Sequence, residues 1–147
     1  MRILLLSGPN LGMLGHRDPA VYGTVTLDEL VTIARTACEV HGAELVHEQH
    51  DAEADLVAAL HRVVTGATPA DAIVINAGAL TQVGYSILDA LLDSGLPFIE
   101  VHLSNIHARE KFRQESVFAA KAIGQMAGFG PAGYIYALDH ISSVVSS

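Results

Sequence analysis

The sequence predicts a single α/β domain in which helices cover both faces of a parallel β-sheet. Short apolar runs alternate along the chain with segments whose apolar residues have the spacing of amphipathic helices. The clearest runs, 2–7 and 71–76, are apolar almost throughout rather than at every second residue, as in strands that are buried on both faces. Because no linker, repeat or low-complexity segment interrupts the pattern, we expect residues 1–147 to form one domain.

Five strands are expected in this domain. We interpret the chain as five consecutive units, each made of a strand followed by a helix. The expected strands cover residues 2–7, 43–48, 71–76, 97–102 and 122–127. The last of these runs also fits the end of a helix, and we interpret it as a strand because turn residues come after it. Helices are expected from Thr26, over 52–64, over 83–93 and in a closing segment that carries Tyr134, Leu138, Ile141 and Val145.

The expected helices carry start and stop signals. Residues 26–29 (TLDE) form a capping box, and the helix has an apolar stripe at Leu27, Leu30, Val31, Ala34 and Cys38. Gly42, Gly66 and Gly95 stand where these helices should end. The second helix is expected to bury one face made of Leu56, Val57, Leu60 and Val64.

Five such units in a chain of this length favour a flavodoxin-like three-layer fold with the strand order 2-1-3-4-5. In this order the first strand lies beside the third and the third beside the fourth, and ligands bind beyond the carboxyl ends of the strands. The loops that leave these three strands begin at Ser7, Asn76 and His102, and all three are polar. The sequence therefore predicts a pocket where these loops meet.

The first of these loops, residues 7–23, is unusually long for a compact domain, which is typical of a functional loop or lid. Its glycines and prolines provide turns and hinges. Its polar side chains include Asn10, Arg17 and Tyr22, a set suited to proton transfer.

Composition excludes several classes of function. The net charge of −8, the lack of tryptophan and the lack of a basic cluster argue against nucleic-acid binding. No apolar run is long enough to span a membrane, and the first residue leads almost directly into a strand. The single cysteine, Cys38, cannot form an internal disulfide, so a cytoplasmic location is expected.

Familiar site motifs are missing or misplaced. There is no P-loop and no Gly-x-Ser-x-Gly elbow, and the GxGxxG pattern at 128–133 is expected to be a turn before the last helix. His47 and His50 fall one residue short of a metal-binding pair, so no metal site is predicted. His102 differs from the other histidines because it ends the fourth strand, at the expected pocket.

Four segments together resemble one enzyme family. The segments SGPNLGMLGHRDPAVYG, INAGALTQ, EVHLSNIHAREKFR and GFGPAGY, in this order, are similar to the motifs of type II 3-dehydroquinate dehydratases over essentially the whole chain. The resemblance implies a flavodoxin-like fold and a cytoplasmic hydro-lyase of the shikimate pathway, which leads to chorismate and the aromatic amino acids. It also implies a dodecamer built from trimers, no cofactor, and a cyclic hydroxy keto acid as substrate.

The resemblance also implies roles for individual residues. Tyr22 would remove the proton next to the substrate ketone, and Arg17 would favour the phenolate form of that base. Asn10 would hold a water that stabilises the enolate oxygen, and His102 would protonate the departing hydroxyl. The residues implied to bind the substrate are Asn76, Gln82, Arg113, the amides of Leu103 and Ser104, and Asp89 from a neighbouring subunit.

Departures from the family pattern leave two alternatives open. Gln82 stands where the family usually has histidine, so the chain could eliminate water from a related cyclic hydroxy ketone. It could also be a non-catalytic module that binds small acids. Covalent catalysis through a lysine is disfavoured because neither Lys111 nor Lys121 lies in an apolar setting at a strand end.

Overall fold

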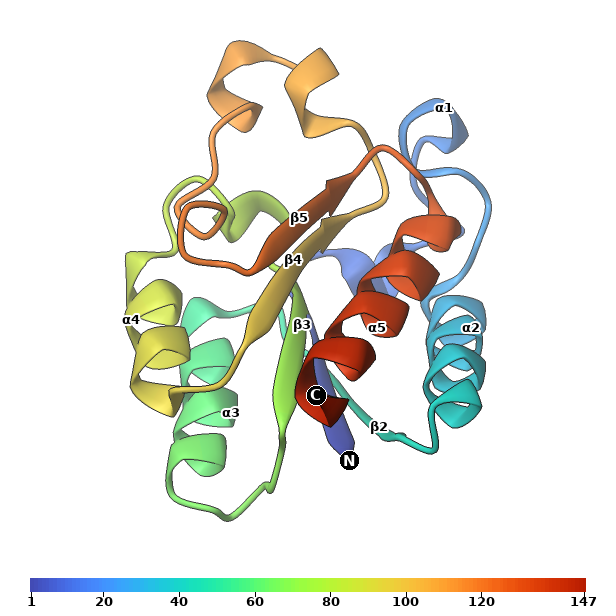
Figure 1. Cartoon of the computed structure of the whole chain (residues 1–147). Coiled ribbons are helices and arrows are strands. Elements are labelled where there is room, and N and C mark those ends of the chain that lie inside the picture. Colours follow the sequence, from blue (N-terminus) through green and yellow to red (C-terminus); the bar gives the residue numbers. More distant parts are fainter.

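A computed structural model describes residues 1–147 and confirms the predicted α/β fold (Figure 1). The five strands are all parallel and have the predicted order β2-β1-β3-β4-β5. In chain order the strands are β1 (Arg2–Ser7), β2 (Glu44–Gln49), β3 (Ala72–Asn76), β4 (Phe98–His102) and β5 (Gly124–Ala127). The α-helices are α1 (Pro19–Tyr22), α2 (Leu27–Val40), α3 (Glu53–Val64), α4 (Tyr85–Ser94) and α5 (Pro131–Ser146).

Two helices cover each face of the sheet, α2 and α5 on one side and α3 and α4 on the other (Figure 1). Side chains of one strand alternate between the faces, so Ile3 and Leu5 of β1 pack with α2 and α5. Leu4 and Leu6 pack with α3 and α4. All four side chains are fully buried, which explains why this strand is apolar throughout.

The predicted helix signals are found where expected, with small shifts. The capping box of α2 is complete: Glu29 N–H donates to Thr26 Oγ1, and the Thr26 N–H donates to Glu29 Oε2. Gly42 comes just after the end of α2 and has a left-handed φ of 64°. The α4 helix begins at Tyr85 rather than at 83, because Val83 and Gly84 still donate to Leu80 O in the preceding turn.

Two expectations about helices were wrong. The buried face of α3 carries Val63, whereas Val64 is 49% exposed. The helical period that places Leu56 and Leu60 inside brings Val63, not Val64, to the same side. In addition, no α-helix lies between β4 and β5, so the strand–helix alternation fails there.

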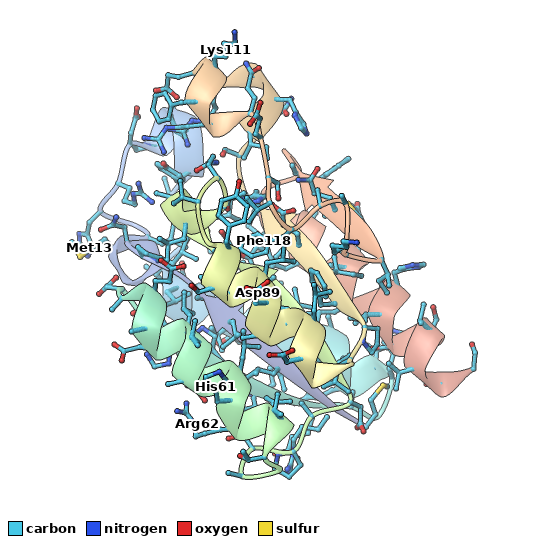
Figure 2. The ribbon with its side chains drawn as sticks, turned by 90° about the vertical axis from the view of Figure 1, so that its left-hand side faces the viewer. Met13, His61, Arg62, Asp89, Lys111 and Phe118 are labelled. Carbon is cyan, nitrogen blue, oxygen red and sulfur yellow. The ribbon has the colours of Figure 1, made fainter.

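The segment 103–123 between β4 and β5 instead folds over the carboxyl edge of the sheet, beside α1 (Figure 1). Its only regular structure is two 3₁₀ turns, η3 (Ile106–Ala108) and η4 (Lys111–Arg113). Phe118 anchors it: this side chain is fully buried in the α3–α4 core, whereas Lys111 projects from the tip (Figure 2). The excursion thus places polar residues above the carboxyl ends of the strands.

No helix is both long and apolar enough to span a membrane.

Candidate active site

The three predicted loops meet in one pocket at the carboxyl edge of the sheet. In register, Ser7 at the end of β1 pairs with Asn76 at the end of β3, so the loops that leave these strands start side by side. Gly8 permits this close approach, because a Cβ at that position would lie only 2.6 Å from Ala77 O. The resulting hollow is lined by residues from all three loops.

Nine of the ten site residues expected from the sequence line this pocket. They are Asn10, Arg17, Tyr22, Asn76, Gln82, His102, Leu103, Ser104 and Arg113. The tenth, Asp89, lies on α4 and does not line the pocket (Figure 2). Its contribution from a neighbouring subunit therefore stays a prediction.

Two guanidinium groups, those of Arg17 and Arg109, contact Tyr22. The short helix α1 presents it, with Asp18 Oδ1 accepting from the Ala20 amide at the helix start. Arg17 Nη2 and Arg109 Nη1 each donate to the Tyr22 hydroxyl oxygen at 3.0 Å. Both guanidinium groups also lie over the ring, 3.8 Å (Arg17) and 5.4 Å (Arg109) from its centre. An oxygen that accepts from two cations is well placed to carry negative charge.

Arg109 is a site residue that sequence reasoning missed, although it lies inside the segment EVHLSNIHAREKFR on which the family resemblance rests. It is 87 residues from Tyr22 in the chain, and only the folding of segment 103–123 over the pocket brings the two together. The only signal in the sequence that could have indicated Arg109 was its place in this family motif. Nothing in local spacing pairs Arg109 with a phenol on another loop.

His102 forms a buried pair with Glu100 on the same strand. The two residues are two positions apart in β4, so their side chains leave the same face, and His102 Nε2 lies 2.5 Å from Glu100 Oε1. Glu100 is fully buried, and its other oxygen accepts from Ser116 Oγ at 2.7 Å and from Gln125 Nε2 at 3.2 Å. The carboxylate that contacts His102 is therefore itself held in place by hydrogen bonds from two other side chains. Glu100 was also missed from the sequence, where it stood inside an apolar run.

Asn76 is held in place by both ends of its amide. Asn76 Oδ1 accepts from the Gly78 amide at 3.1 Å, and Asn76 Nδ2 donates to the Tyr134 hydroxyl at 2.8 Å. Tyr134 on α5 is fully buried, and this burial raises the pKa of its phenol. One N–H of Asn76 stays available to the pocket.

Gln82 and Arg113 both line the pocket and are joined by a hydrogen bond. Gln82 Nε2 donates to Arg113 O at 3.1 Å, which leaves Gln82 Oε1 free to accept a hydrogen bond from a ligand. Arg113 Nε is buried without a hydrogen bond, although it lies 3.2 Å from Glu110 Oε2 in an ion pair. Arg113 also lines the pocket, where a guanidinium group suits a carboxylate ligand.

Outside the pocket, His47 and His50 have separate partners. His47 Nε2 lies 3.0 Å from Ser7 Oγ, and His50 Nε2 lies 2.7 Å from Glu48 Oε2. Burial lowers the pKa of His47, with a further contribution from the charge of Arg35. No three His, Cys, Asp or Glu side chains gather as the ligands of a metal ion would.

Fold and pocket together define a flavodoxin-like α/β domain with a polar pocket at the switch point of its sheet. A model of the family described as class II dehydroquinase matches residues 1–142, so the chain belongs to that family. It is 47% identical over 138 residues to a 3-dehydroquinate dehydratase of Shewanella sp. (strain W3-18-1), covering 94% of this chain and 92% of that protein.

Solved structures agree with this assignment. A type II dehydroquinase from Propionibacterium acnes superimposes with a TM-score of 0.88 at 39% identity, covering 97% of this chain and 96% of the other. One from Butyrivibrio crossotus superimposes with a TM-score of 0.90 at 37% identity, covering 96% of this chain and 97% of the other.

Proposed function

We propose that this chain is a 3-dehydroquinate dehydratase that eliminates water from 3-dehydroquinate, with anti geometry, to give 3-dehydroshikimate. Family membership supports the substrate and the reaction. The observation that supports the mechanism is that one pocket is lined by both Tyr22, with its two guanidinium groups, and His102, with Glu100.

In the first step Tyr22, as the phenolate, removes the proton from the carbon next to the substrate ketone. The C–H electron pair passes into the ring as an enolate. The two guanidinium nitrogens that lie 3.0 Å from the Tyr22 oxygen would stabilise the negative charge on this base. Asn10, in the same pocket, holds a water that donates a hydrogen bond to the enolate oxygen.

In the second step the enolate collapses and the C–O bond of the leaving hydroxyl breaks. His102 donates a proton to this hydroxyl, which departs as water. Glu100, whose Oε1 lies 2.5 Å from His102 Nε2, orients the imidazole ring for this transfer. Tyr22 has gained one proton and His102 has lost one, so transfer through solvent restores both groups.

The remaining polar groups orient the substrate. Arg113 and the amides of Leu103 and Ser104 bind the carboxylate, while Asn76 and Gln82 hydrogen-bond the ring hydroxyls. All five residues line the pocket. We propose that Asp89 completes the site from a neighbouring subunit.

The proposed elimination breaks one C–H and one C–O bond and forms a C=C bond with no net oxidation or reduction, so it requires neither a redox group nor a covalent intermediate. A Schiff-base route would need an amine in the pocket, and neither lysine of the chain lines it. Lys111 points away from the molecule at the tip of segment 103–123 (Figure 2).

We further propose a homo-oligomer, as a dodecamer built from trimers, in the cytoplasm, where the enzyme serves the shikimate pathway toward chorismate and the aromatic amino acids. The apolar side chains exposed on and just before α4 support an oligomer: Val83 is 59% exposed, Tyr85 65% and Leu92 47%. The free thiol of Cys38 supports a reducing compartment. Light scattering of the purified protein tests the assembly.

A paralogue acting on a related cyclic hydroxy ketone is the second candidate, and Gln82 favours it. One N–H of its amide is committed to Arg113 O, and the side chain cannot carry the charge of the usual histidine. The experiment measures the absorbance of the conjugated enone with 3-dehydroquinate and with a panel of related hydroxy ketones. We expect 3-dehydroquinate to be the best substrate. Turnover of another ketone alone would favour the paralogue, whereas binding without turnover would favour a non-catalytic binding module.

A further inference from the structure

Asn10 has an unusual position, because nothing in the chain holds its side chain. The carboxamide lines the pocket and makes no hydrogen bond within the protein. The Asn10 backbone is in the left-handed region with φ 66° and ψ 0°, and this conformation sets the direction in which the Cα–Cβ bond leaves the loop. Asn10 is the only residue other than glycine with a positive φ in the structure. Such a conformation persists when the surroundings hold it.

The group that holds this backbone is Asp51, in the loop between β2 and α3. Asp51 Oδ1 accepts from the Asn10 amide at 3.0 Å. The same oxygen accepts from Gln49 Nε2 at 3.0 Å, and Gln49 Nε2 also lies 3.1 Å from Gly8 O. These hydrogen bonds lower the pKa of the Asp51 carboxyl. Gln49 and Asp51 thus connect the end of β2 to both sides of Pro9.

The opposite side of the loop is fixed independently. The Gly8 amide donates to Asn76 O at 2.7 Å, which attaches the loop to β3. Gln49 Oε1 lies 3.3 Å from where a Cβ of Gly12 would be, so the glutamine also fits closely beneath the 3₁₀ turn η1 (Leu11–Met13). The start of the loop is therefore held between β2 and β3. These contacts fix the backbone position of Asn10.

An ordinary role for Asp51 would be to cap its own helix. Asp51 comes just before Ala52, the N-cap of α3, but the start of that helix receives no side-chain cap. The Asp51 carboxylate instead accepts the hydrogen bond from the backbone N–H of Asn10 in the first loop. Because Asp51 is exposed, its removal should cost little stability.

We propose that Asp51, supported by Gln49, is a positioning residue for Asn10: it fixes the left-handed turn that directs the Asn10 carboxamide, and the water it holds, toward the enolate oxygen. The inference rests on the proposed function, since it concerns the site of that reaction.

The test is a double-mutant cycle on kcat. Asp51→Ala is expected to lower kcat by about 10- to 100-fold, as for a misplaced catalytic group, with KM changed by less than about threefold. Asp51→Asn keeps Oδ1 and should restore most of the rate. In the Asn10→Ala background, Asp51→Ala should have no further effect, because the residue acts only through Asn10. Asp55→Ala is the matched control, because Asp55 is a nearby exposed residue on the first turn of α3 and lies outside the pocket.

The possible outcomes distinguish a failure of the proposed function from a failure of the positioning role of Asp51. A wild-type protein with no turnover of 3-dehydroquinate would refute the proposed function. With an active wild type, equal losses from Asp51→Ala in both backgrounds, or no loss in either, would overturn the positioning role. A drop in Tm that accounts for the loss of rate would also overturn it. Gln49→Ala provides a second, independent variant and is expected to give a smaller loss of kcat in the same direction.

Discussion

Replacing Arg109 by alanine should slow turnover by about 30-fold. Arg109 Nη1 donates to the Tyr22 hydroxyl oxygen at 3.0 Å, and its side chain is 19% exposed, so water screens the pair only moderately. Two unit charges about 4 Å apart attract by about 4 kcal/mol at an effective dielectric constant of about 20. About half of this gain is lost because a better-stabilised phenolate is a weaker base. The remaining effect of about 2 kcal/mol is about 30-fold in kcat.

The assay is the initial rate of enone formation at saturating substrate, and guanidinium ion added to the Ala variant should recover part of the lost rate. Arg35→Ala is the control, because Arg35 is exposed on α2, away from the pocket. An Arg109→Ala rate within about threefold of wild type would refute the reasoning, since the second cation would then contribute nothing.

Three further predictions concern buried groups. Because burial lowers the pKa of His47, the unfolded chain binds a proton more readily. The free energy of unfolding should therefore fall as the pH drops below about 6.5, and urea titrations of His47→Gln should show a weaker dependence. Burial raises the pKa of the Cys38 thiol to about 11, so the native protein should resist a thiol reagent at pH 8 and react once it is denatured. Tyr134→Phe removes the acceptor of Asn76 Nδ2 and should lower the free energy of unfolding by about 1–3 kcal/mol in urea titrations, whereas an unchanged midpoint would contradict the importance of that bond.

The fold was predictable because its signals are local and agree with one another. A strand such as β1 is apolar throughout, and the capping box at 26–29 fixes the start of α2. The sequence also located the pocket, since the strand order alone brings together the polar loops after Ser7, Asn76 and His102. These features require only hydrophobic periodicity and the geometry of parallel sheets.

The details that sequence reasoning missed depend on contacts between distant parts of the chain. The segment 103–123 has no helical period, so neither its path nor the approach of Arg109 to Tyr22 could be read from spacing. Glu100 looked like one polar residue in a buried strand, and only its contacts with His102 and Ser116 reveal its place in the site. Val64 was assigned to the buried face in place of Val63, a one-residue error in helical phase.

The most direct measurement is the rate of enone formation by Tyr22→Phe, because the whole mechanism depends on the Tyr22 phenol as the base. The variant keeps the ring beneath the two guanidinium groups and loses only the oxygen that accepts their hydrogen bonds. We predict a loss of kcat of about 100-fold or more, with the protein still folded and still binding substrate. A folded Tyr22→Phe protein that turns over 3-dehydroquinate at close to the wild-type rate would contradict the assignment of the base.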